Sequence, residues 1–403
     1  MTTATLAPGR ETRREIRTLG VVSTVHLVSH FYWLLFVPLL PSLKEMLGVS
    51  YVELGFALFV MNIVSALIQA PTGFAVDRFG ARLFLVIGVA LGAAGFILLG
   101  VFPSYHLLLF AAVLVGAGNA VYHPADYSIL SAEMSPQRMG RAYSLHTFSG
   151  YLGFALTPPI VLGLVYTAGP RAALIVCGVI GVVLSLPLLP DVPGEWRATA
   201  KRNDAPQAAK TSSLSLFTPS VLALTAMFTV INLSTNMMQT YMVVSLRDLF
   251  GLPQAVGETA LTLFMFTLVA GVLGGGFLAD RAKSKGFVTL GGFGCAAIVT
   301  LLAGSFNYGA FFTVSMIGLA GLLAGLIMPS RDMLVRMASP PDAVGRVFGI
   351  VTTGFNIGGM IGPVAGGMLI DHGMPRLIFW GSAAFMLITI AIALLVERKA
   401  GPR

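Results

Sequence analysis

The chain has 403 residues, of which 56% are hydrophobic and 10% are charged, and its mean hydropathy is +0.85. A soluble domain usually contains about 25% charged residues, so 25 Lys and Arg with 17 Asp and Glu are too few to cover a surface in water. This composition excludes an ordinary soluble enzyme and indicates a membrane protein. The net charge is +8, but no basic stripe with interleaved aromatic residues occurs, so we predict no nucleic-acid partner.

Long apolar runs fill most of the chain. A helix that crosses a bilayer needs about 20 mostly apolar residues. The run that starts at residue 19 follows a polar segment and is too long for the apolar part of a cleavable signal peptide, so we expect it to remain in the protein. Twelve runs predict spans at 19–43, 52–76, 83–102, 107–134, 142–167, 171–190, 218–246, 256–279, 287–305, 309–335, 346–370 and 376–396.

Lys and Arg are distributed unevenly among the segments that join these runs. If the N-terminus is cytoplasmic, the outer loops contain only Lys44, Arg171, Arg247 and Arg376, and the other loop Lys and Arg lie in cytoplasmic segments. Cytoplasmic loops of membrane proteins are enriched in these residues. We therefore predict a multi-pass plasma-membrane protein with both termini in the cytoplasm.

The two halves of the chain repeat each other. Gly73–Arg78 (GFAVDR) is similar to Gly276–Arg281 (GFLADR), which follows 203 residues later. A repeat at a fixed offset is typical of transporters built from two bundles. The sequence thus predicts an N-terminal domain over 1–190, a cytoplasmic linker over 191–217 and a C-terminal domain over 218–403.

Twelve spans in two sets of six, with an Asp-Arg loop after spans 2 and 8, resemble the major facilitator superfamily. Gly73–Arg82 (GFAVDRFGAR) matches the loop motif of that family. Val115–Pro124 (VGAGNAVYHP), followed by Gly140-Arg141-Ala142, resembles the fosmidomycin-resistance type of bacterial efflux protein. The resemblance implies an all-α integral membrane protein of the bacterial inner membrane, a monomer whose two pseudo-symmetric six-helix bundles rock about a central cavity.

The resemblance also implies a gate on the cytoplasmic side. Asp77 would hold one bundle against the N-terminus of span 11, where a carboxylate is favoured, and Arg78 and Arg82 would complete a charge relay. Asp280 and Arg281 occupy the equivalent loop of the second repeat. The alternative for these residues is a topology signal alone.

Span 4 contains a group of polar residues that includes His123, Asp126 and Tyr127. An ionisable group near the middle of a bilayer costs about 2.5–3.5 kcal/mol on insertion scales, so it usually has a function or a partner. His123 and Asp126 are three residues apart and lie near one helix face. We expect His123 and Asp126 to share and release a proton or to bind the substrate; the alternative is a structural hydrogen bond. Tyr127 would shape the site.

Other histidines occur in spans 1 and 5. His26 and His30 are one turn apart in span 1, and His146 lies in span 5. We expect His30 to face the cavity, whereas His26 and His146 either face it or brace the helices. Two histidines four residues apart also match a metal-ligand spacing, so transport of a metal or a metal chelate stays an alternative, although we predict no resident metal.

Arg331 is the arginine that this topology places inside a span, and Asp332 follows it. A guanidinium binds a carboxylate or phosphonate through two parallel hydrogen bonds. Two roles stay open, the binding of an anionic solute or an internal bridge to Glu133 or Asp126. Adjacent residues of a helix point about 100° apart, so Asp332 need not pair with Arg331.

Amide side chains form a stripe along span 7, where Asn232, Asn236 and Gln239 share a face, and span 11 contains Asn356. We expect a polar cavity wall here, with contacts between helices as the alternative. The glycine-rich stretch 358–367 predicts close packing of span 11 and a bend at Pro363.

These features predict a secondary active transporter and not an enzyme. No nucleotide-binding loop or metalloprotease motif is present in the sequence. The predicted substrate is a small organic solute, anionic or zwitterionic and including drugs, that crosses by proton-coupled alternating access, with export favoured. The alternatives are proton-coupled uptake of an organic acid and export of a metal or its chelate. We expect no cofactor, a proton gradient as the driving force, and no partners beyond the solute and the lipid bilayer.

Overall fold

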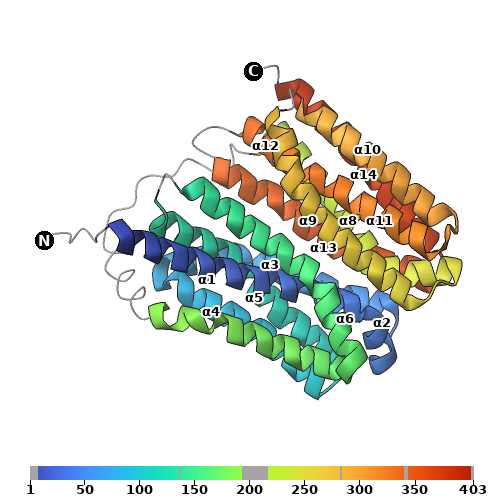
Figure 1. Ribbon diagram of the computed structural model, residues 1–403, viewed down its shortest axis with the longest axis horizontal. Coiled ribbons are helices and arrows are strands. Elements are labelled where there is room, and N and C mark those ends of the chain that lie inside the picture. The colour runs from blue at the N-terminus through green and yellow to red at the C-terminus, as the bar shows by residue number, and fades with distance from the viewer. Residues whose placement is uncertain (1–7, 136–137, 193–216, 282–283, 340–343, 401–403) are drawn as a thin grey trace, which may run out of the picture. The chain divides into compact units, whose positions relative to one another are not determined.

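The computed structural model describes residues 8–135, 138–192, 217–281, 284–339 and 344–400, and the regular elements in these ranges are all helical (Figure 1). In chain order they are α1 (Pro8–Leu34), α2 (Phe36–Leu47), α3 (Tyr51–Phe79), α4 (Ala81–Val101), α5 (Tyr105–Glu133), α6 (Met139–Ser185), the 3₁₀ turn η1 (Leu186–Asp191), α8 (Pro219–Phe250), α9 (Gln254–Arg281), α10 (Lys285–Ser305), α11 (Gly309–Leu326), α12 (Met328–Ala338), α13 (Val344–Asp371) and α14 (Arg376–Ala400).

Helix α6 accounts for two of the predicted spans. Among the described residues, 11 helices are long and apolar enough to cross a membrane. Helix α6 has 47 residues, which at 1.5 Å per residue gives about 70 Å, more than twice the hydrocarbon thickness of about 30 Å. Gly169, with φ 84° and ψ 165°, interrupts this helix between the predicted spans 142–167 and 171–190. The prediction of an all-α membrane protein with twelve spans is therefore confirmed.

Two other predicted spans each consist of two helices, and a proline explains each break. Pro38 has no N–H that could bond to the carbonyl of Leu34, which is the last residue of α1. In the same way, Pro329 has no N–H that could bond to the carbonyl of Gly325, close to the end of α11. Arg331 consequently lies in the first turn of the short helix α12.

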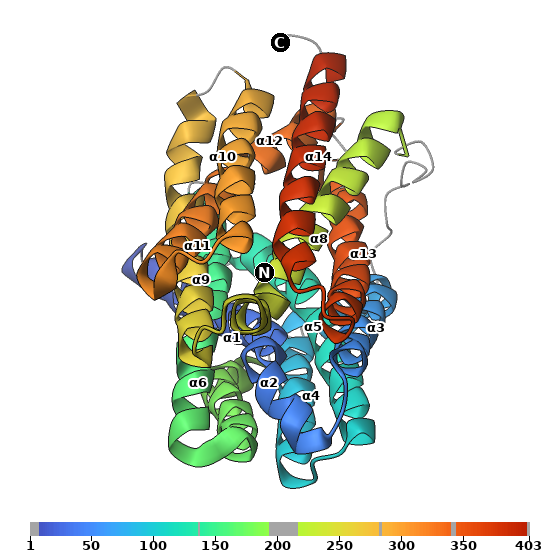
Figure 2. The same ribbon diagram turned by 90° about the vertical axis from the view of Figure 1, so that its right-hand side faces the viewer.

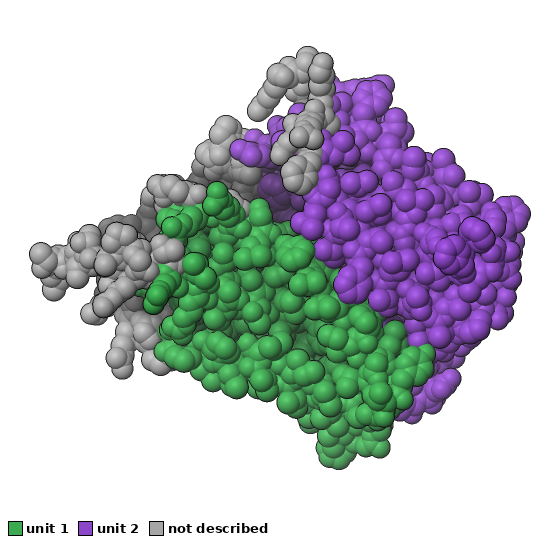
Figure 3. All heavy atoms as spheres, viewed as in Figure 1, with its two compact units in different colours: residues 1–36, 64–207 green, residues 37–63, 208–403 purple. Residues whose placement is uncertain are grey.

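The described residues group into two compact units (Figure 3). Unit 1 comprises those of 1–36 and 64–207, and unit 2 comprises those of 37–63 and 208–403. Helix α3 therefore contributes its first part to unit 2 and its second part to unit 1. Most of the predicted linker lies outside the described residues, and the domain boundaries at 190 and 218 stay a prediction.

In unit 1, α1 packs against α6 and α5, and α4 packs against α5 and α6. Tyr32 of α1 is fully buried, and its hydroxyl donates to the carbonyl of Gly178 over 2.7 Å. Gly92 and Gly181 leave room for this ring, because a Cβ at either glycine would overlap it. Small residues thus bring the helices that surround the candidate site into close contact.

In unit 2, α13 lies along α8, α11 lies along α9, and α14 contacts α8 and α10 (Figures 1 and 2). Gly354 and Gly358 of α13 face the backbone of α8, and Gly366 faces the ring of Tyr241. The hydroxyl of Tyr241 donates to the carbonyl of Pro363 over 2.7 Å. The predicted close packing of the glycine-rich stretch 358–367 is therefore confirmed.

The contact between α9 and α11 supplies a test of this packing. A Cβ at Gly325 would overlap the backbone carbonyl of Leu268 and lie 3.0 Å from the Cα of Gly271. Backbone atoms cannot move aside, so we expect Gly325→Ala to destabilise the protein by about 1–3 kcal/mol. Gly294→Ala is the matched control, since nothing lies within 4 Å of its Cβ position. Thermal unfolding in detergent measures both variants, and equal melting temperatures would contradict the packing.

Candidate functional site

The titratable residues predicted in three separate spans form one cluster in unit 1, where α1, α5 and α6 pack together (Figure 1). Its members are His26 and His30 of α1, His123 and Asp126 of α5, and His146 of α6.

Asp126 is the centre of this cluster and is fully buried, with 0% of its surface exposed. Its Oδ2 lies 2.9 Å from Nδ1 of His26 and 3.6 Å from Nε2 of His146, and both histidines are buried. Residues three apart lie side by side on a helix but project outward, so the carboxylate meets histidines of the neighbouring helices. The role predicted for His123 and Asp126 in proton coupling or substrate binding stays a prediction.

The imidazole rings are in direct contact. The rings of His26 and His146 stack with their centroids 3.7 Å apart, and the centroid of His30 lies 4.5 Å from that of His26. The ring of His123 lies 5.3 Å from His26. A Cβ at Gly150 of α6 would lie 2.8 Å from Nε2 of His26 and 2.9 Å from Nε2 of His30. The absence of a side chain at position 150 therefore creates the space for these rings.

Several buried polar atoms of the cluster have no hydrogen-bond partner within the described part of the chain. They are Oδ1 of Asp126, Nδ1 of His30 and both ring nitrogens of His146. Buried polar atoms in proteins are normally paired, and leaving one unpaired costs about 1–3 kcal/mol. The cluster can therefore accept a proton or a polar ligand without breaking its existing hydrogen bond.

The donor types also suit a metal. His26, Asp126 and His146 each offer one ligand atom, and these atoms lie within 4.8 Å of one another. Two imidazoles and a carboxylate could hold a transition-metal ion with further positions open.

Tyr127 lies at the edge of the cluster. Its side chain is 45% exposed, and its ring centroid lies 5.7 Å from that of His146 and 6.3 Å from that of His123. Phe154 of α6 covers His30, with ring centroids 4.3 Å apart. Phe154 and Gly150 were not predicted as site residues, because a small and an apolar residue in an apolar span give no signal of function.

Arg331 lies in unit 2. The partner that the structure describes is Asp332, whose Oδ1 lies 2.8 Å from Nη2 and 2.9 Å from Nε of Arg331. Among the described contacts, Glu133 binds Arg82 and Asp126 binds His26, and the alternative of a bridge from Arg331 to Glu133 or Asp126 stays a prediction. Helix geometry left the pairing of Arg331 with Asp332 open, and in the structure the two neighbours do pair.

The predicted amide stripe lies on one side of α8. Asn232, Asn236 and Gln239 are all half-buried, as is Asn356 of α13. Oδ1 of Asn232 has no hydrogen-bond partner among the described residues, and Oδ1 of Asn236 accepts from Thr240 over 3.4 Å. These residues belong to unit 2, whereas the histidine cluster belongs to unit 1.

Of the predicted gate, only part can be described. Arg82 is buried and its Nη2 lies 2.7 Å from Oε1 of Glu133. Arg78 is exposed, with its guanidinium 5.2 Å from the ring centroid of Phe79. The side chains of Asp77, Asp280 and Arg281 lie outside the described residues. The pairing of Arg82 with Glu133 was not predicted.

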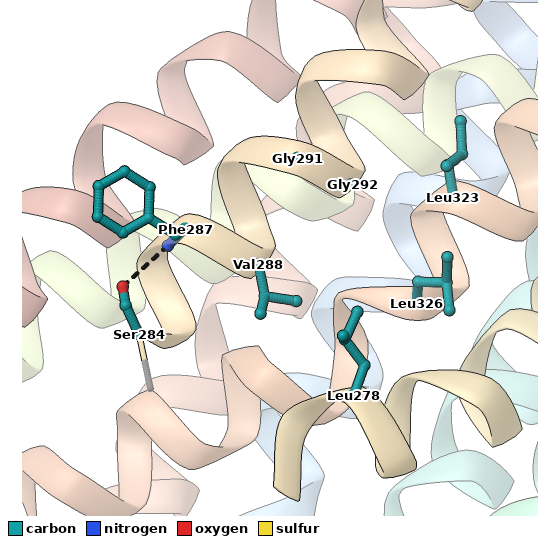
Figure 4. Close-up of a pocket in the computed structure, with 8 residues that line it drawn as sticks. All are labelled: Leu278, Ser284, Phe287, Val288, Gly291, Gly292, Leu323 and Leu326. Atoms are coloured by element: carbon teal, nitrogen blue, oxygen red, sulfur yellow. Dashed lines mark hydrogen bonds between the residues drawn. The ribbon is translucent and has the colours of Figure 1, made fainter. Parts of the chain in front are cut away.

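A pocket of about 610 Å³ lies between α9, α10 and α11 (Figure 4). Leu278, Phe287, Leu323 and Leu326 line it, and Ser284 caps α10 by accepting a hydrogen bond from the N–H of Phe287. It contains none of the predicted site residues, and its apolar lining offers no group for proton or anion chemistry.

Comparisons with known proteins agree with the fold and with the predicted resemblance. The family model of the Major Facilitator Superfamily matches residues 22–319 and 258–403. The chain is 25% identical to the fosmidomycin resistance protein of Escherichia coli over 374 residues, which cover 91% of this chain and 89% of that protein. It is 28% identical to the probable sulfoacetate transporter SauU of Cupriavidus necator over 382 residues, or 88% and 87% of the two chains.

Among solved structures, the chain is similar to a bacterial homologue of the human lysosomal transporter Spinster in an inward-facing and occupied conformation. The TM-score is 0.76 at 14% identity, and the match covers 98% of both chains. At this identity the similarity concerns the fold.

The contact between His26 and Asp126 can be measured directly. A double-mutant cycle of His26→Ala and Asp126→Ala, read by chemical unfolding in detergent, should give a coupling energy of about 1.5–3 kcal/mol, as for hydrogen bonds with a charged partner. In a Gly150→Ala background the new methyl group displaces His26, and the coupling should fall towards zero. Gly163→Ala is the control on the same helix, because nothing lies within 4 Å of that Cβ position. A coupling that survives in both backgrounds would refute the role of Gly150.

Proposed function

The chain belongs to the Major Facilitator Superfamily, and we propose that this transporter exports a small organic anion or zwitterion across a bacterial inner membrane in exchange for protons. Membership of this family makes it a multi-pass membrane transporter with a small-molecule substrate, not an enzyme. The proposal concerns five points: the coupling ion, the charge of the solute, the direction of transport, the identity of the membrane, and the cytoplasmic position of both termini.

The observation on which proton coupling rests is the buried contact between Asp126 and His26. The titratable groups around this carboxylate are His26 and His30 from α1, Tyr122 and His123 from α5, and His146 from α6. Gain or loss of one proton changes the net charge of a site that has little contact with water. Binding of a charged solute and binding of a proton are then linked, and the linkage is reciprocal.

The charge of the solute is inferred from unit 2 and from two relatives. Arg331 supplies a permanent positive charge, and the amide stripe on α8 supplies donors and acceptors. One relative is named for fosmidomycin resistance and another for probable sulfoacetate transport, and sulfoacetate is an organic anion. The name of the first relative also favours export over uptake, so uptake of an organic acid is the alternative.

We further propose that the predicted cytoplasmic gate works with a rigid unit 1. The ion pair of Arg82 with Glu133 joins the start of α4 to the end of α5, and Thr18 of α1 donates to the same carboxylate over 2.8 Å. These contacts allow three helices to move as one body. Asp77, Arg78, Asp280 and Arg281 then act as the gate itself.

A second candidate function is transport of a divalent metal or its chelate. The donor set of His26, Asp126 and His146 favours it. The transport assay below separates it from the first candidate.

Purified protein in liposomes, with an imposed pH gradient, tests the proposal. We expect the gradient to drive flux of phosphonoacetate, sulfoacetate or malonate through the natural protein. Asp126→Asn should abolish the response to the gradient, because an amide cannot exchange a proton. Asp248→Asn is the matched control, since Asp248 lies at the end of α8 and pairs with its neighbour Arg247.

Two outcomes would contradict the proposal. One is gradient-driven flux that Asp126→Asn leaves unchanged. The other is flux of Zn²⁺ or Ni²⁺ without flux of any acid, which would favour the second candidate.

A further inference from the structure

The guanidinium of Arg331 is enclosed by apolar side chains of unit 2. Its Cζ lies 4.5 Å from the ring centroid of Phe228 on α8 and 5.1 Å from that of Phe355 on α13. Only 6% of Arg331 is exposed. Phe228 is part of the hydrophobic core of this unit, and Phe355 packs against that core. Because the guanidinium does not lose its proton in proteins, a permanent positive charge is held within apolar surroundings.

The sequence neighbour Asp332 contacts this guanidinium with poor geometry. Nε and Nη2 of Arg331 both contact the same oxygen, Oδ1 of Asp332, although two such N–H groups suit the two oxygens of one acid group. Nη1 donates to Sδ of Met328 over 3.1 Å, and a thioether is a weak acceptor. The side chain of Asp332 is 46% exposed, so it has room to turn away from Arg331 while α12 stays in place.

We propose that Arg331, between Phe228 and Phe355, binds the acid group of the solute, and that Asp332 occupies this position in the solute-free protein. This inference rests on the proposed function and names the residues that recognise the solute. One negative group replaces another, so Arg331 contacts a negative group before and after binding. The exchange thereby avoids the cost of an isolated buried charge.

Asn232 extends the site and narrows the chemistry of the solute. It lies one helical turn after Phe228 on α8, and Gly358, three residues after Phe355, packs against its Cβ. The unpaired acceptor Oδ1 of Asn232 therefore selects a solute that has a hydroxyl or N–H donor in addition to its acid group.

Thermal unfolding of the full-length protein in detergent provides the test. The probes are propylphosphonate, propanesulfonate and butyrate, together with 3-hydroxypropylphosphonate, which adds the donor. Each should raise the melting temperature, because a ligand that binds only the folded protein stabilises it. The hydroxylated probe should act at the lowest concentration.

Four substitutions separate this account from a purely structural ion pair. Arg331→Gln should abolish the shifts, and Arg331→Lys should weaken them about tenfold, because an ammonium cannot form the two parallel bonds. If Asp332 occupies Arg331 in about nine of ten solute-free molecules, only about one in ten is ready to bind a probe. Asp332→Asn should then lower the probe concentration needed for half-saturation about tenfold. Asn232→Leu should remove only the preference for the hydroxyl group.

The controls address folding and position. Asp248→Asn removes the acid from another adjacent Arg-Asp pair, Arg247 with Asp248, and should change nothing. The double variant Arg331→Gln with Asp332→Asn removes both charges of this pair, so it should fold and still not bind the probes.

The proposal is overturned if none of the probes shifts the natural protein, if Arg331→Lys binds them as well as Arg331 does, or if Asp332→Asn weakens binding. Its failure is separate from that of proton coupling. Gradient-driven flux that is lost in Asp126→Asn but unchanged in Arg331→Gln would overturn only this anion site.

Discussion

A carboxylate with no access to water determines how unit 1 is built. Asp126 is fully buried on α5, and its hydrogen bond comes from His26 on α1, with His146 of α6 close by. Removing one member of a buried polar pair leaves the other unpaired, which is costly. The three helices must therefore keep fixed positions along one another. Gly150 and Gly153 allow α6 to approach α1 closely enough for the side chains of this cluster to meet.

The two units hold complementary chemistry. Unit 1 contains groups that gain and lose protons, and unit 2 contains a cation that keeps its charge. In the proposed cycle, a proton joins or leaves the pair of Asp126 with His26, and an acid group joins or leaves Arg331. At Arg331 one acid group replaces another, so no isolated charge is left in an apolar medium. At Asp126 the proton changes the net charge of the buried site, and this change links the proton to the charged solute.

Much of this account follows from the sequence, and the contacts that were not predicted have a common cause. Apolar run lengths predict the spans, and the histidines and Asp126 stand out because ionisable residues are rare in such runs. The contact of His26 with Asp126 was not predicted, since contacts within a helix are visible in a sequence and contacts between helices are not. The pairing of Arg331 with Asp332 stayed open for a related reason: helix geometry gives the direction of Cβ, not the path of a long guanidinium side chain. Gly150 acts by having no side chain, which no single sequence reveals.

The most direct test of the central claim is to count protons when solute binds. Purified protein in weakly buffered detergent solution is mixed with the acid identified in the transport assay, and a pH indicator follows the exchange. We predict a proton exchange that saturates with solute in the natural protein and is absent in Asp126→Asn, with solute binding itself still measurable by calorimetry. The same exchange in both proteins would show that Asp126 does not couple protons to transport.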